Sequence, residues 1–160
     1  MKKRSGEHPF GDVGQLILLG VFLVVWAADS FSLHTSTFLS HYLPLWVRLL
    51  ILGLALIVAL LLFKSGHVVV NHNERHDGVM VTGAFRYVRH PLYLASILTY
   101  LGLTVSTMSI FSLALLAGIS IFYNYIASYE EKLLEIRFGE DYGRYKKRTG
   151  KWVPRIGRER

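Results

Sequence analysis

The stretch Leu45–Phe63, LWVRLLILGLALIVALLLF, decides the fold class of this chain. Its only charged residue is Arg48, and its length is close to the roughly 20 residues that cross about 30 Å of hydrocarbon as a helix. An apolar stretch of this length is typical of a transmembrane helix. We therefore predict that Leu45–Phe63 spans a membrane.

Three further apolar segments lie on either side of this stretch. They cover roughly Val13–Ala28, Leu92–Val105 and Ser109–Ala127. The last two are separated only by Ser106–Met108, which predicts a tight helical hairpin. The pattern predicts an all-α integral membrane protein with about four transmembrane helices, followed by a C-terminal cytoplasmic or interfacial helix.

The positive charges predict the orientation of these helices. The chain has 18 Lys and Arg residues and a formal net charge of +7. All of the Lys and Arg except Arg48 lie before the first apolar segment, between the second and third, or after the fourth. Cytoplasmic loops carry such an excess, so both termini and the middle loop are predicted to be cytoplasmic. Topology accounts for the charge, and no nucleic-acid partner is expected.

We interpret residues 1–160 as a single membrane domain. Residues 1–63 form two N-terminal spans, 64–91 a cytoplasmic loop, 92–127 the hairpin and 128–160 a cytoplasmic tail. In the loop, Asp77-Gly78 favours a turn between Val68–Val70 and Val79–Val81, although an extended loop is equally compatible.

The tail is charged, with apolar residues interspersed. We predict that the fourth helix continues to about Phe138 and stops at Gly139. A shorter amphipathic helix, Asp141–Arg148, would then lie on the membrane surface, where Tyr142 and Tyr145 suit the interface.

Ionisable groups at a membrane edge are candidates for function because they are costly to place there. The hairpin brings its two open ends together, and carboxylates there can bind ammonium or hydroxyl groups while Arg and helix N–H groups bind a carboxylate. Headgroup anchoring by the arginines and pairing of the glutamates with Lys132 or Arg137 is an equally weighted alternative. The candidate residues are Arg86, Arg89, His90, Tyr93, Glu130 and Glu131.

We predict no metal site. The chain has no cysteine, which excludes disulfides, thiolate nucleophiles and Cys-ligated metals. His72 and His76 are four residues apart, but Asn71 and Asn73 argue against a helix there. With His67, they are interpreted as solvated loop histidines.

Two stretches of this sequence resemble the signature of the isoprenylcysteine carboxyl methyltransferase family. Val81–Tyr93, VTGAFRYVRHPLY, has a glycine, an aromatic residue two positions later, and Arg-His-Pro-x-Tyr. The resemblance covers about residues 79–156. Its second half consists of Glu130-Glu131-x-Leu133, Phe138-Gly139, Tyr142, Tyr145 and Val153-Pro154.

The resemblance implies an integral-membrane enzyme that transfers methyl from S-adenosylmethionine to a lipid-like or small apolar acceptor. The wider superfamily includes phospholipid and small-thiol methyltransferases. Arg89 or Arg86 would hold an anionic group, and Glu130 is a candidate base for an amine acceptor. The cofactor contacts that the resemblance implies are His90, Pro91, Tyr93, Glu130 and Glu131.

Two spans before the signature are similar to the smaller prokaryotic members, which implies a prokaryotic inner (cytoplasmic) membrane. Membrane lipid and the acceptor, a carboxylate, thiol or amine, are the expected partners, and no obligate protein partner is inferred. Two other functions stay open: an NADPH-dependent membrane reductase of the sterol or steroid type, and a non-catalytic lipid-binding membrane protein.

Overall fold

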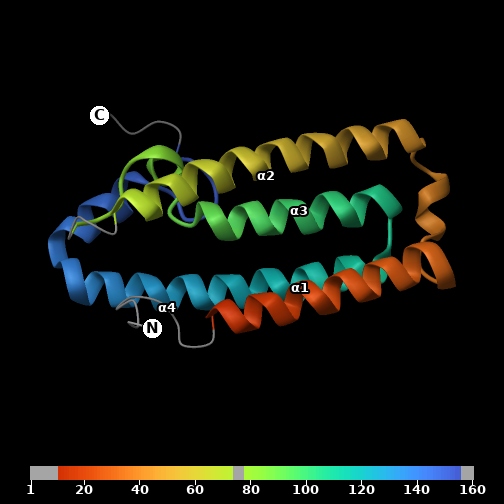
Figure 1. The fold of residues 1–160 in the computed structure, drawn as a ribbon, viewed down its shortest axis with the longest axis horizontal. Coiled ribbons are helices and arrows are strands. Elements are labelled where there is room, and N and C mark those ends of the chain that lie inside the picture. The colour runs from red at the N-terminus through yellow and green to blue at the C-terminus, as the bar shows by residue number, and fades with distance from the viewer. Residues whose placement is uncertain (1–10, 74–77, 156–160) are drawn as a thin grey trace.

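The structure, a computed structural model, describes residues 11–73 and 78–155. Four helices lie side by side in an elongated bundle: α1 (Gly11–Ala27), α2 (Leu45–Asn73), α3 (Pro91–Thr107) and α4 (Ile110–Arg148) (Figure 1). A π-helix (Ala28–Leu33) and two 3₁₀ helices (Phe38–His41 and Gly83–Arg86) lie in the connections. No strand occurs in these described residues, so the prediction of an all-α fold is confirmed.

Three helical segments are long and apolar enough to cross a membrane: Val13–Leu33, Leu45–His67 and α4. Helix α3 is apolar too, but its 17 residues extend only about 26 Å at 1.5 Å per residue. It packs against both α2 and α4, so protein covers much of its surface. The all-α membrane fold is confirmed, and three helices have the length and composition of a span; the count of four stays a prediction.

Apolar side chains divide into a lipid-type outer surface and a small core. Leu16 and Val24 on α1, and Leu54 and Leu60 on α2, are exposed. Such apolar outer faces are expected where the solvent is hydrocarbon. The buried core lies where α1, α3 and α4 meet, and consists of Phe22, Tyr100, Leu116, Ile119 and Tyr123.

A polar cluster closes the end of the bundle where α1 ends and α4 begins. The buried Asp29 carboxylate accepts hydrogen bonds from Thr35 Oγ1 (2.8 Å), Ser36 N (3.0 Å), Ser36 Oγ (2.5 Å) and Ser109 Oγ (2.6 Å). Ser109 is also the N-cap of α4 and accepts from Ser112 N. We call these residues the Asp29 cluster; they join the first connection to the α3–α4 turn.

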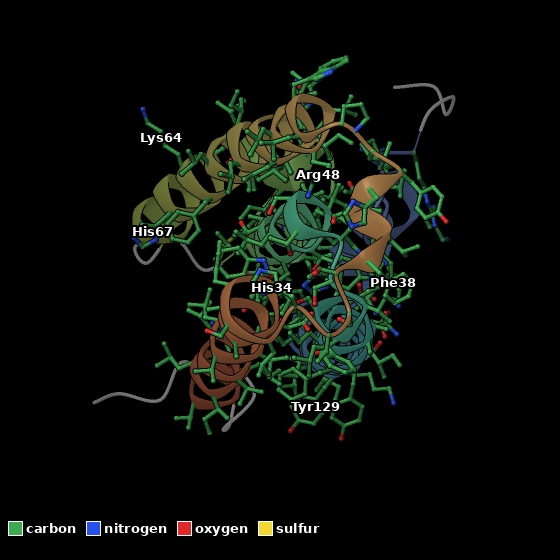
Figure 2. All side chains as sticks on the ribbon, turned by 90° about the vertical axis from the view of Figure 1, so that its right-hand side faces the viewer. His34, Phe38, Arg48, Lys64, His67 and Tyr129 are labelled. Atoms are coloured by element: carbon green, nitrogen blue, oxygen red, sulfur yellow. The ribbon has the colours of Figure 1, made fainter. Side chains whose placement is uncertain are left out.

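Arg48, the exception to the charge asymmetry, lies at this same end, which Figure 2 views directly. Its Nη1 donates to the carbonyl of Ser106, 2.8 Å away, in the last turn of α3. A cation there stabilises the helix C-terminus. Arg48 therefore has a hydrogen-bond partner within the protein at this end of the bundle, which accounts for its departure from the charge asymmetry.

The helix of the second apolar segment is longer than the sequence predicts. Helix α2 continues to Asn73, so the loop begins later than residue 64, and Val68–Val70 is helical instead of one arm of a hairpin. Asn71 and Asn73 do not stop the helix, because propagating an existing helix gains a hydrogen bond per residue and outweighs their weak propensity. Asp77 of the expected turn lies outside the described residues.

The predicted break at Gly139 is confirmed. Its φ of 51° and ψ of −121° are non-helical, and the chain turns back there before continuing helically to Arg148 (Figure 1). The predicted interfacial placement of Tyr142 and Tyr145 is wrong, because both are buried. The turn folds them against the segment before α3, where Tyr145 Oη donates to the Phe85 carbonyl at 2.7 Å.

Candidate active site

The start of α3 is held in place by the end of the chain. Pro91 is the first residue of α3 and keeps the preceding His90 out of helical conformation, with φ −125° and ψ 64°. Val88 forms a parallel bridge with Gly150, and the Arg89 amide donates to the Gly150 carbonyl at 2.9 Å. Two segments distant in sequence are thereby fixed side by side.

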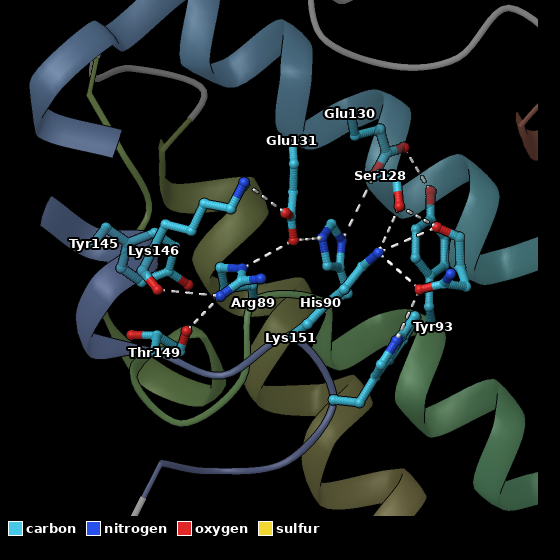
Figure 3. A network of polar contacts seen from close by, with 12 residues as sticks. Arg89, His90, Tyr93, Ser128, Glu130, Glu131, Tyr145, Lys146, Thr149 and Lys151 are labelled. Carbon is cyan, nitrogen blue, oxygen red and sulfur yellow. Dashed lines mark hydrogen bonds and ion pairs between the residues drawn. The ribbon is translucent and has the colours of Figure 1, made fainter. Parts of the chain in front are cut away.

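Glu131 is the centre of the site (Figure 3). Its buried Oε1 accepts from Arg89 Nε at 2.9 Å and lies 3.1 Å from His90 Nε2. Its Oε2 is 3.4 Å from Lys146 Nζ. A buried carboxylate without partners would be very costly, and these three groups compensate for that cost. They also fix the Glu131 side chain in position, and each of them would lose a partner if Glu131 were replaced.

Burial favours the neutral form of His90. Burial lowers the pKa of its imidazole below the usual 6.5, because a charged ring would lose its hydration, and this outweighs the opposing effect of Glu131. A neutral ring that donates to Glu131 has its hydrogen on Nε2, so Nδ1 is an acceptor. Nδ1 lies 3.7 Å from Glu130 Oε2. A ligand N–H or O–H donor placed there would meet two acceptors.

Glu130 lies beside an aromatic stack. Tyr93 Oη donates to Glu130 Oε1 at 2.6 Å. The Tyr93 ring stacks on His90, with centroids 5.8 Å apart, and on Tyr123, with centroids 5.2 Å apart. The Glu130 side chain is 14% exposed against 6% for Glu131, so Glu130 is the more accessible of the two carboxylates.

Arg89 is buried and bonded to the protein itself. Besides Glu131, it contacts two carbonyls at the end of α4, because Nη1 donates to Thr149 O at 2.5 Å and to Lys146 O at 3.3 Å. These contacts tie the last turn of α4 to the start of α3. The predicted role of Arg89 in holding an anionic group of the ligand stays a prediction. Its described contacts favour a role in positioning other residues.

The structure adds two residues of the tail that sequence reasoning missed. Lys151 Nζ donates to Ser128 Oγ (2.7 Å), Asn124 Oδ1 (2.8 Å) and Asn124 O (3.2 Å). Trp152 Nε1 donates to Asn124 Oδ1 at 3.3 Å, and its ring centroid is 5.9 Å from that of His90. The one available signal was a Trp next to Lys after the last helix, a pair typical of membrane interfaces.

The predicted site residues do not all meet. Arg89, His90, Glu130 and Glu131 form one network with Tyr93 (Figure 3). Pro91 is buried at its edge as the first residue of α3. Arg86 is exposed in the 3₁₀ helix Gly83–Arg86, and the network's described contacts do not include it.

An apolar groove lies next to this network. It has a volume of about 200 Å³ and is lined by Leu94 and Ile97 of α3, Ser120 of α4, and Trp152 of the tail. Ser120 Oγ donates to the Leu116 carbonyl of its own helix at 2.8 Å. The groove therefore presents mainly aliphatic and aromatic surface.

Histidines and carboxylates are the candidate metal ligands of a chain without cysteine. Within residues 11–73 and 78–155, apart from side chains that are not described, no group of three or more could hold a metal ion. The structure does not describe the side chain of His72, and His76 lies outside the described residues.

The sequence model of one family matches more than half of this chain. The family is described as phospholipid methyltransferase, and the match covers residues 49–141. It includes most of α2, all of α3 and most of α4, and with them the Arg-His-Pro segment and the Glu130-Glu131 pair. No curated protein and no solved structure matches the chain.

Proposed function

This chain belongs to the phospholipid methyltransferase family, and on that premise we propose that it transfers methyl from S-adenosylmethionine to a lipid-like or small apolar acceptor. The observation that carries this proposal is the meeting of His90, Tyr93, Glu130 and Glu131 at one end of an apolar helix bundle. The Lys and Arg asymmetry supports placing that end at the cytoplasmic face, with both termini in the cytoplasm.

The chemistry of these residues fits the proposed cofactor. S-adenosylmethionine carries a sulfonium cation, an amino-acid group and a ribose, and supplies an activated methyl group together with its own leaving group. Glu130 suits an ammonium or a ribose hydroxyl, and the rings of His90 and Tyr93 lie beside it. We propose that Pro91 shapes the backbone of this site.

The residues would act mainly by positioning. Glu131 fixes the His90 ring, so that Nδ1 and Glu130 Oε2 face the same space 3.7 Å apart. Such fixed acceptors hold a donor in one orientation, and orientation is a large part of the catalysis of group transfer. A carboxylate or thiolate acceptor is already a nucleophile, whereas an amine acceptor must lose a proton, for which Glu130 is the candidate base.

Arg89 and Arg86 have different places in this proposal. Arg89 holds Glu131 and the carbonyls of Lys146 and Thr149, so its main effect would be to keep the site assembled. A contact between either arginine and an anionic group of the ligand stays a proposal. Arg89→Lys tests it, because Lys lacks the planar fork that makes several directed bonds. Near-normal turnover in Arg89→Lys would leave Arg86 as the candidate.

Calorimetry on the purified protein tests the proposed function. We expect binding of S-adenosylhomocysteine and none of NADPH, and weaker binding in Glu130→Gln, whereas Glu140→Gln, whose side chain is 95% exposed, serves as the matched control. NADPH binding would favour the reductase alternative, and binding of neither ligand would favour a lipid-binding protein. Radiolabel transfer from S-adenosylmethionine to extracted lipids or small thiols would then identify the acceptor.

A further inference from the structure

We propose that the groove beneath Trp152 and the ammonium of Lys151 together bind the methyl acceptor. The groove would hold the acceptor's apolar chain, and Lys151 an anionic group on the same molecule. This inference rests on the proposed function and names the substrate class as an anionic amphiphile.

The size of the groove fits part of a ligand. At about 200 Å³ it is smaller than the roughly 300–1,000 Å³ typical of complete small-molecule sites. Leu94 and Ile97 form one wall and the Trp152 ring another, while the Ser120 hydroxyl is bonded within its own helix. A hydrocarbon segment therefore suits it better than a compact polar molecule.

The groove and the polar network share a wall. Trp152 lines the groove, and its ring lies 5.9 Å from His90 between centroids. Leu94 directly follows Tyr93, whose hydroxyl is bonded to Glu130, and Ile97 lies one helical turn after Tyr93. A molecule whose chain occupies the groove would consequently have its polar end beside Trp152, whose ring centroid is 5.7 Å from Lys151 Nζ, at the edge of the proposed methyl-transfer site.

Lys151 supplies the charge that selects an anion. Its three described partners are neutral oxygens of Asn124 and Ser128, and no described carboxylate lies within ion-pair distance of Nζ. Lys146 differs, because it pairs with Glu131 at 3.4 Å and Glu135 at 2.7 Å. These partners occupy the three N–H donors of the ammonium but do not neutralise its charge, so a phosphate or carboxylate would replace one of them or be held by the charge itself.

Lys151 and Trp152 also have a simpler explanation as an interface anchor. A Trp ring and a Lys ammonium commonly hold a segment at the membrane surface. An anchor would stabilise the tail but would not discriminate between ligands of opposite charge. The two roles therefore differ in their dependence on the ligand's headgroup.

Photo-crosslinking in phosphatidylcholine nanodiscs distinguishes these roles. The probes are a long-chain fatty acid with a diazirine in its chain and the primary amine with the same chain. We expect the carboxylate probe to label peptides containing Leu94–Ile97 and Trp152, and the amine to label them about tenfold less, since one charge-assisted contact changes affinity by that order. Equal labelling by both probes would overturn the role of Lys151.

Matched variants distinguish binding of the probe's charged headgroup from binding of its hydrocarbon chain. Lys151→Gln should lower carboxylate labelling about tenfold, whereas Lys147→Gln, at an exposed position in the same tail, should not change it. Ser120→Phe should fill the groove and abolish labelling by both probes. Its control is Gly118→Phe, whose added side chain would point into open space on α4. Ile97→Phe provides a second way to fill the groove.

Failure of this inference can be distinguished from failure of the proposed function. Monodisperse elution and a near-normal unfolding temperature establish that each variant is folded. Unchanged labelling in folded Ser120→Phe and Ile97→Phe would overturn the groove assignment, whether or not S-adenosylhomocysteine binds. Absence of S-adenosylhomocysteine binding to the unmodified protein would overturn the methyltransferase proposal, while headgroup-selective labelling would still support an anionic-amphiphile site.

Discussion

Each end of the helix bundle contains a buried carboxylate, but the two carboxylates have different kinds of partner. Asp29 is surrounded by Thr35, Ser36 and Ser109, short neutral side chains close to the ends of α1 and α4. Glu131 is surrounded by the charged or titratable groups Arg89, His90 and Lys146, which come from two parts of the chain, the segment before α3 and the end of α4.

This difference is the reason that we place the proposed site at the Glu131 end of the bundle. All four described hydrogen bonds to the Asp29 carboxylate come from the connection between α1 and α2 and from the N-cap of α4, and they close this end of the bundle. At the other end Glu131 holds His90, while the more exposed Glu130 lies beside it and next to an apolar groove. The Asp29 cluster is thus a structural closure, whereas the Glu131 network supports a second, accessible carboxylate.

Removal of the Glu131 charge should have the largest effect. Glu131→Gln leaves the buried Arg89 without its carboxylate, and breaking a buried pair costs about 3–5 kcal/mol in free energy of unfolding. Thermal or denaturant unfolding in detergent measures this, and S-adenosylhomocysteine binding should also be lost. Glu135→Gln is the control, because its pair with Lys146 is partly exposed and should contribute at most about 1 kcal/mol.

Asp29→Asn should reduce stability without affecting the proposed site. The amide retains one acceptor oxygen but loses part of the contacts from Ser36 and Ser109, and a hydrogen bond to a charged group contributes about 1.5–3 kcal/mol. Unfolding should shift accordingly, while calorimetry on the folded protein should show unchanged S-adenosylhomocysteine affinity. A tenfold loss of that affinity would remove the functional distinction between the two ends.

Glu130→Gln should show the opposite pattern. S-adenosylhomocysteine affinity should fall about ten- to a hundredfold, the effect of losing one charge-assisted hydrogen bond. Stability should change less than in Glu131→Gln, because Glu130 is the more exposed of the two carboxylates and the amide oxygen can still accept from Tyr93 Oη. If unfolding shifts as much as in Glu131→Gln and binding does not change, then Glu130 is structural and the site lies elsewhere.

The smallest effect concerns pH. Since His90 has a lowered pKa in the folded protein, the unfolded chain binds its proton first as pH falls through about 6.5. Stability should therefore decrease as pH falls below that value, by up to about 1.4 kcal/mol per pH unit until the folded-state pKa is reached. Unfolding between pH 7 and pH 5 should be less pH-dependent in His90→Gln. The exposed His41 provides the control substitution, His41→Gln, which should retain the wild-type slope.

The sequence alone determined the helical class, the membrane setting and the core of the site. Apolar length shows directly in Leu45–Phe63, and Gly139 predicts its break because few other residues adopt a positive φ. The Arg-His-Pro segment and the glutamate pair were placed together because a hairpin must bring its open ends close. These are local or nearest-neighbour properties of the chain.

Only the tertiary structure decided which groups share a contact across long separations. Tyr142 and Tyr145 are buried because the chain folds back after Gly139, and Lys151 and Trp152 reach Asn124 because Gly150 pairs with the start of α3. Arg89 likewise holds carbonyls about sixty residues away along the chain. No local pattern specifies such contacts, since they depend on how whole helices pack and turn, and that packing determines which charges remain available for a ligand.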